Sequence, residues 1–333
     1  MSYELSILTK TQRFIPAIQD GITLKSDAYG SPESLEFTVI KDKYLSFEEG
    51  AQVIFSVDGK KRFNGFVFSK DFDKKKFIQI TAYDQLRYMK NKDSFLIENE
   101  KASDFLIRLC AEFDLIPGDI EDTGYVIEKM ALDNMTLIDM VNQALEATLM
   151  NTGRKYCYYD NDGRIDLKDI EKNSAEYLIT NETASNFKYS SSIEDTYNRV
   201  KLIKMFKVDG ISEKTGRKKK VEVASEPIYA KDAASMAKFG TLQFFSDEFS
   251  EVDNIENIAQ LILEVNSDKK RSLSISRCFG DPSLRGGKSI IVDIDIDDDL
   301  KVAKRFFVNS CTHYFLNDDH NMDVDLIVKG IKK

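Results

Sequence analysis

The sequence FNGFVFSKDFDKKKFIQITAYDQL, residues 63–86, contains two runs in which apolar side chains occupy alternate positions. The first run covers residues 63–68, the second covers 78–83, and the polar segment 71–76 separates them. Alternation with a period of two places one face of a strand on a core and leaves the other for solvent or a partner. The segment therefore predicts two strands joined by a charged turn, within a scaffold built from β-strands. It offers no plausible nucleophile, base or metal-ligand set.

The same alternation continues through residues 1–90. It recurs at Leu35, Phe37 and Val39 and again over residues 53–57, where Asp58-Gly59 then gives a strong tight-turn signal. Several short strands separated by turns predict a first β-barrel-like domain over residues 1–90.

Residues 91–184 change to a mixed pattern, which predicts a small α+β domain. A first amphipathic helix is expected after Ser103, its N-cap, because apolar residues recur there at a spacing of four: Phe105, Leu109 and Phe113. A second helix is expected from Leu137, where Thr136 and Asp139 resemble a weak capping box. A hairpin with its turn at residues 160–163 completes this domain.

Residues 185–333 return to strands and predict a second β-rich domain. It contains a basic loop at about 207–220, with Lys214–Lys220 at its tip, and one helix at about 253–268. Asp253 and Glu256 resemble a capping box for this helix, whose apolar face is Ile255, Ile258, Ala259, Ile262 and Val265. The predicted fold class is therefore mainly β with an α+β part, in which two β-barrel-like domains flank a small acidic domain.

Length and composition fit a soluble multidomain protein. A chain of 333 residues suggests two to four domains, and 42% hydrophobic and 31% charged residues are typical of globular proteins. The chain lacks the run of about 18 apolar residues that a membrane helix needs, and its first residues lack the apolar core of a signal peptide. We therefore expect no membrane segment, a protein assembled in a cytoplasm, and four buried or partly buried thiols at Cys110, Cys157, Cys278 and Cys311.

Charge is concentrated in the middle of the chain. The net charge is −9, and residues 91–184 alone hold 9 basic and 20 acidic residues, a net charge of −11. An acidic total argues against specific nucleic-acid binding by the whole protein.

Two candidate ligand motifs fail their tests. Residues 282–289 end like a phosphate-binding loop, but Pro282 takes the place of the first glycine and a strand pattern follows where a helix is needed. His313 and His320 flank a hairpin turn with no third metal ligand and no catalytic partner in the sequence, so we expect structural or surface histidines.

An acidic row alternates with isoleucines near the C-terminus. Asp293, Asp295 and Asp297 cannot open a calcium-binding EF-hand loop, because Asp298 and Lys304 replace the required glycine and glutamate. Three alternatives stay open: a solvated edge strand, a carboxylate face lining a channel, and an adventitious cation site. We predict no catalytic residue, no cofactor and no required metal.

The ordered motifs of the chain resemble the XkdQ/YqbQ proteins of PBSX-like contractile tails and the wider late-control-protein-D group of tail hubs. The similarity covers nearly the whole sequence, and its most specific part is Phe63-x-Gly65-x-Val67 followed by Ile78-x-Ile80-x-Ala82-Tyr83-Asp84-x-Leu86. In the last third it rests on Asn198-Arg-Val, Lys238-Phe-Gly240 and Gly280-x4-Leu-x-x-Gly287-x3-Ile-Val. The short charged insertion at Lys214–Lys220 departs from the pattern.

The resemblance implies a structural baseplate hub of a contractile phage tail or a phage-tail-like bacteriocin. Such a hub is a homotrimer whose two β-barrel-like domains per subunit make a ring of six similar units. The ring adapts a six-fold tail tube protein to a three-fold spike or tip protein, beside other baseplate proteins. The implied location is the baseplate of the tail, assembled in the host cytoplasm.

Two other function classes compete with this hypothesis. A tail-associated peptidoglycan hydrolase would sit at the same place, but the sequence carries no catalytic signature. A surface adhesin built from β domains would need export, which the N-terminus does not predict.

Overall fold

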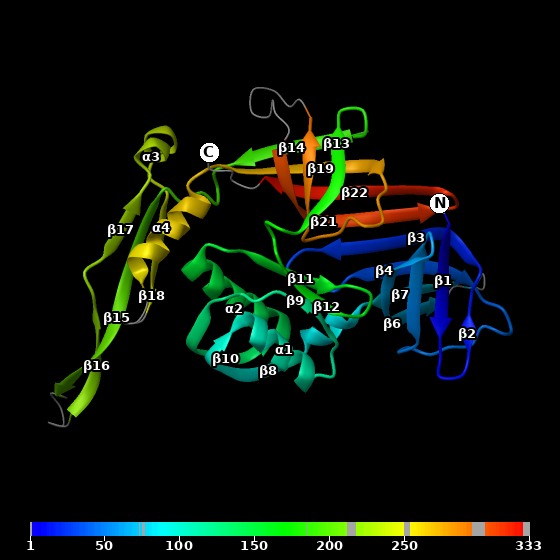
Figure 1. Cartoon of the computed structure of the whole chain (residues 1–333), viewed down its shortest axis with the longest axis horizontal. Coiled ribbons are helices and arrows are strands. Elements are labelled where there is room, and N and C mark those ends of the chain that lie inside the picture. The colour runs from blue at the N-terminus through cyan, green and yellow to red at the C-terminus, as the bar shows by residue number, and fades with distance from the viewer. Residues whose placement is uncertain are drawn as a thin grey trace. The chain divides into compact units, whose positions relative to one another are not determined.

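The computed structural model describes residues 2–72, 74, 77–184, 186–211, 218–249, 254–294 and 304–328. The chain packs as two compact units (Figure 1). The first comprises residues 1–149, 154–189 and 272–329, and the second comprises 150–153, 190–271 and 330–333. The three-domain division at residues 90 and 184 stays a prediction.

A thirteen-stranded sheet dominates the first unit, and its strands come from both ends of the chain. The hydrogen-bonded order is β14-β19-β22-β21-β3-β4-β7-β6-β5-β1-β2, with β20 also paired to β21 and β13 paired to β20. The bounds are β1 Tyr3–Leu8, β2 Arg13–Phe14, β3 Ile18–Asp27, β4 Ser34–Ile40, β5 Gln52–Val57, β6 Lys60–Phe72, β7 Phe77–Tyr83, β13 Ser174–Thr180, β14 Asn186–Ser192, β19 Lys270–Phe279, β20 Ser289–Asp293, β21 Lys304–Leu316 and β22 Asp319–Val328.

The mainly β fold class is confirmed, including the strands expected from residues 63–86. Phe63 and Val67 of β6 and Ile78 and Ile80 of β7 point into the core, as their alternation predicts. Among the described strands, pairing follows an open path and closes no barrel.

Antiparallel pairing of β3 with β21 joins the two β regions in one sheet. Six residue pairs from Ser310↔Asp27 to Phe315↔Ile22 make this seam. Phe315 therefore packs in the core of the N-terminal strands, although it lies in the last third of the chain. A separate core gathers apolar side chains of β19 to β22.

The middle of the chain adds helices and two small sheets to the first unit, as expected for an α+β part. The bounds are η1 (a 3₁₀ helix) Gln85–Lys90, β8 Lys92–Lys101, α1 Ala102–Glu112, β9 Pro117–Ile120, β10 Val126–Thr136, α2 Leu137–Thr152, β11 Tyr156–Asp160 and β12 Ile165–Asp169. Strands β8 and β10 pair with each other, and β11, β12 and β9 form the next sheet.

The two predicted helix starts in this part have different outcomes. Thr136 caps α2 as expected, because its Oγ1 accepts from the Asp139 amide at 3.1 Å. Ser103 as the cap of α1 is wrong: the helix begins at Ala102 directly after β8, and the Ser103 hydroxyl accepts from the Thr123 amide at 3.4 Å.

The second unit is a four-stranded sheet with two helices. The bounds are β15 Arg199–Ile211, β16 Lys218–Ala224, β17 Ile228–Lys231, α3 Ala233–Phe239, β18 Gln243–Phe249 and α4 Ile255–Asn266. Asn254 caps α4 by accepting from the Asn257 amide at 3.2 Å, whereas Asp253 lies outside the described residues. The expected apolar face of α4 is buried except for Val265, which is 54% exposed, so the prediction is wrong at that residue.

The described helices are all too short or too polar to cross a membrane.

Candidate functional site

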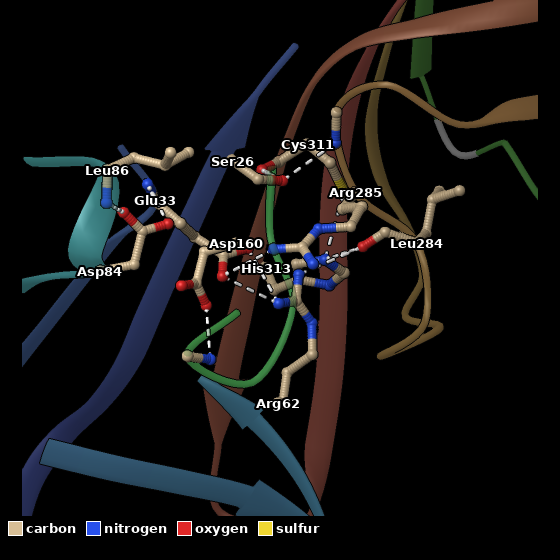
Figure 2. A network of polar contacts seen from close by, with 12 residues as sticks. Ser26, Glu33, Arg62, Asp84, Leu86, Asp160, Leu284, Arg285, Cys311 and His313 are labelled. Atoms are coloured by element: carbon tan, nitrogen blue, oxygen red, sulfur yellow. Dashed lines mark hydrogen bonds and ion pairs between the residues drawn. The ribbon is translucent and has the colours of Figure 1, made fainter. Parts of the chain in front are cut away.

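Buried charge is concentrated where several segments of the first unit meet (Figure 2). These segments are the loop between β3 and β4, the start of β6, the junction of β7 and η1, the end of β11, the loop before β20, and the hairpin of β21 and β22. We define the buried charge network as Glu33, Arg62, Asp84, Asp160, Arg285, His313 and His320.

Glu33 is the centre of the network and binds two arginines at once. Its carboxylate lies 2.8 Å from Nη1 of Arg62 and 3.1 Å from Nη2 of Arg285. All three side chains are less than 10% exposed. One buried carboxylate and two guanidinium groups together carry a net positive charge. Removing the carboxylate would leave both buried cations without a counter-charge.

Two more carboxyl groups stand close by. Asp84 caps η1 by accepting from the Leu86 amide at 3.0 Å, and it also accepts from the Glu33 amide at 3.0 Å. Burial, reinforced by the negative charges of Asp160 and Glu33, raises the pKa of Asp84 well above its ordinary value. Burial likewise raises the pKa of Asp160 to about 6, although hydrogen bonds from the Gly163 amide and Gln85 act against it.

His313 and His320 meet inside the hairpin of β21 and β22. Nε2 of His313 lies 2.9 Å from the Leu284 carbonyl oxygen, which only accepts, so this nitrogen carries the proton. Nδ1 of His313 then accepts from Nε2 of His320 at 3.0 Å. Burial lowers the pKa of both, that of His320 to about 4. The sequence predicts structural or surface histidines, and both side chains are buried.

A cysteine beside this histidine pair invites comparison with a catalytic Cys–His dyad. Sγ of Cys311 lies 3.3 Å from Nε2 of His313. Burial raises the pKa of the Cys311 thiol, and both residues have no solvent exposure. A nucleophilic cysteine needs a lowered pKa and access to substrate, so the geometry favours a packed thiol. All four cysteines are free and buried, as expected.

The loop before β20 is the strand-leading turn that the sequence predicts. Its Gly286 amide donates to the Ser26 hydroxyl at 3.1 Å, and its Arg285 belongs to the buried charge network. The described residues contain no group of three or more His, Cys, Asp or Glu side chains placed to hold a metal ion.

The acidic row is described only at its start. Asp293 is exposed on β20, opposite the buried Ile290, Val292 and Ile294. Asp295 and Asp297 lie outside the described residues, as do residues 212–217 of the predicted basic loop. Orientation of the row toward a channel therefore stays a prediction. The prediction of a loop is wrong for residues 207–211 and 218–220, which belong to the paired strands β15 and β16.

Sequence reasoning missed the buried charge network almost entirely. Glu33 and Arg285 are separated by 252 positions, and neither lies in a periodic pattern. The usable signals were Asp84, a carboxylate between the end of an apolar strand and Leu86, and the short interval between the two histidines.

Comparison with known proteins identifies a sequence family that spans most of the chain. Residues 22–327 match the family described as YqbQ-like. The chain is 28% identical over 337 residues to the uncharacterized protein YqbQ of Bacillus subtilis (strain 168), an alignment that covers 98% of this chain and 97% of the relative. It is 27% identical over 336 residues to the phage-like element PBSX protein XkdQ of the same organism, with the same coverage.

A solved structure shares the fold at low sequence identity. The 43 kDa tail protein of prophage MuSo2 from Shewanella oneidensis superposes with a TM-score of 0.68 at 10% identity, covering 97% of this chain and 98% of that protein.

Proposed function

The chain belongs to the YqbQ-like family, and from this membership we propose that it is a structural protein of a phage tail. The relative named as a phage-like element protein supports this role, since the alignment runs over nearly the full length of both chains. The shared fold with a prophage tail protein supports it independently.

The more specific proposal is a trimeric baseplate hub that joins a six-fold tail tube to a three-fold spike. The observation that carries it is the seam between β3 and β21, which holds two β regions with separate cores in one sheet. A chain with two such regions can supply two similar modules per copy, so that three copies supply six. Sheet edges, which attract other strands, would be covered in a closed ring of this kind.

The proposal assigns no catalysis to the buried charge network. Its charged groups pair with one another across segments that are far apart in the sequence. Such pairs hold the segments together, which is a structural role. A peptidoglycan hydrolase remains the rival function, and a cell-wall turnover assay on the purified chain tests it directly.

The decisive experiment is electron microscopy of the purified chain, alone and with its tail tube and spike proteins. We expect three copies in a ring, with interfaces above about 2,000 Å² as in obligate assemblies. In that ring the two β regions should line the axis and residues 91–184 should lie outside. A different copy number, or residues 91–184 lining the axis, would refute the hub while leaving a tail role open.

A further inference from the structure

A cleft of about 440 Å³ opens in the first unit beside the buried charge network. The β5–β6 turn, the turn after β11 and the loop before β20 form its walls. It is lined by Val57, Asp58, Lys60, Lys61, Arg62, Tyr159, Asn161, Asp162, Asp281, Pro282, Ser283, Arg285 and Lys288.

Five of the lining residues are basic and three are acidic, and the acidic ones already have partners. Asp58 accepts from the Ser2 amide at 2.8 Å, and Asp281 accepts from the Ser283 amide at 2.8 Å. Asp162 lies 3.5 Å from the ammonium group of Lys61. These contacts occupy acceptor atoms of all three carboxylates, although each carboxylate keeps its charge.

Lys288 is the clearest unsatisfied group in the cleft. It is partly buried, and its ammonium group has no hydrogen bond or ion pair among the described residues. Burial, and then the positive charges of Arg285 and Arg62, lower the pKa of Lys288, and the negative charge of Asp281 opposes them only in part. An ammonium group that is partly removed from water and faces two guanidinium groups is stabilised by an added anion.

Arg285 gives a second and independent indication. It is 7% exposed, and its Nε is buried without a hydrogen-bond partner. Its guanidinium group shares Glu33 with Arg62 and lies 4.6 Å from the centre of the Tyr159 ring. The Glu33 carboxylate thus pairs with two buried arginines, and Lys288 beside them has no ion-pair partner among the described residues.

We propose that this cleft binds a carboxylate side chain from an acidic segment of a partner protein. The ammonium groups of Lys288 and the exposed Lys60 would contact the bound carboxylate. The buried guanidinium groups of Arg285 and Arg62 would add a positive electrostatic potential at the same place. The proposal rests on these local charges and does not depend on the assembly role.

A protein carboxylate fits the surroundings better than a nucleic acid does. The chain has a net charge of −9, and Asp58, Asp162 and Asp281 line the cleft, so a long nucleic-acid strand would meet repulsion beyond it. Because salt screens charges beyond about 8 Å at physiological ionic strength, a single side chain senses mainly the cations next to it. A volume of about 440 Å³ accommodates a few side chains.

The test is calorimetric titration of the full chain with a short oligoglutamate peptide and, as the matched ligand, an oligoglutamine peptide of equal length. We expect binding of the first only, weakening as salt rises. Lys288→Gln should weaken it about tenfold or more, since it removes a charge-assisted contact. Lys60→Gln, at an exposed position, should weaken it less.

Lys129→Gln is the control variant, because it removes the same charge from an exposed position on β10. It should leave binding unchanged, and circular dichroism should show the same fold for all three variants. Equal binding of both peptides, or no effect of Lys288→Gln, would overturn the proposal. So would Lys288-dependent binding of inorganic phosphate or single-stranded DNA that is tighter than binding of oligoglutamate.

Discussion

Phe315 of β21 packs edge to face against Phe55 of β5, with ring centroids 4.9 Å apart. Both rings have at most 1% exposure, and they come from opposite ends of the chain. The seam between β3 and β21 therefore joins the two regions through side chains as well as through backbone pairing. The fold of the N-terminal strands depends on a residue more than 230 positions beyond them.

Phe315→Ala tests this dependence. We expect a loss of about 3–5 kcal/mol in the free energy of unfolding, because a buried ring is replaced by a cavity. Urea denaturation followed by circular dichroism measures it. Phe279→Ala is the control, since Phe279 is 70% exposed, and should change stability by less than about 0.5 kcal/mol. Similar losses for the two variants would contradict the interlocked core.

Glu33→Gln tests the centre of the buried charge network. It leaves Arg62 and Arg285 buried without a counter-charge, which typically costs about 3–5 kcal/mol of unfolding free energy. Arg285→Met introduced together with it should recover part of that loss, because one stranded cation is removed. Urea denaturation of both variants provides the measurement.

Glu4→Gln is the matched control for this change. Glu4 pairs with Arg13, and both side chains are more than half exposed, so the loss should stay below about 1 kcal/mol. If Glu33→Gln were as mild as Glu4→Gln, the network would not be a structural clamp.

His320→Asn tests the histidine pair through the dependence of stability on pH. The pKa of His320 is lowered in the folded state to about 4 from an ordinary value of 6.5. Between these values the unfolded chain binds the proton more tightly, so this group makes stability fall as pH decreases from 6.5 to 4. Asp160 acts oppositely, because its raised pKa makes stability fall as pH rises toward 6.

The difference in unfolding free energy between the wild-type protein and His320→Asn, taken at each pH, isolates the contribution of His320. We expect the wild-type protein to lose about 1–2 kcal/mol relative to the variant over this range, which allows for partial solvent screening. Denaturation at a series of pH values measures the two curves. Parallel curves would mean that His320 does not carry the effect.

Short-range patterns predicted the strands well because burial follows local alternation. Leu35, Phe37 and Val39 are all buried on β4, as a period of two requires. The same reasoning placed Val265 on the buried face of α4. Val265 does point in the same direction around the helix axis as the buried residues, but no neighbouring element in the described chain covers that end of the helix. Periodicity gives a direction around a helix, and the neighbours decide burial.

Long-range partners could not be predicted from one sequence. Nothing near Glu33 indicates that its partners are Arg62 and Arg285, since both contacts form only when distant segments of the chain come together. The two histidines were placed on either side of a hairpin turn, and the pairing of β21 with β22 then brings their side chains together. Local signals thus gave the strands and the turns, while the candidate site depends on how distant segments meet.

Gly30→Ala tests how closely the loop after β3 approaches β11. Gly30 has φ of +76°, and a Cβ built on it would lie 2.0 Å from Cζ of Tyr158, a ring with 1% exposure that cannot retreat into solvent. Gly50 has φ of +84°, and a Cβ built on it would have no other atom within 4 Å. Both substitutions carry the strain of a left-handed residue, about 1–2 kcal/mol, so their difference isolates the steric clash. We expect Gly30→Ala to lose at least about 1–3 kcal/mol more than Gly50→Ala in urea denaturation, the usual range for overpacking a rigid core. Equal losses would show that the loop can move away from Tyr158, and the close packing of these two segments would then be dispensable.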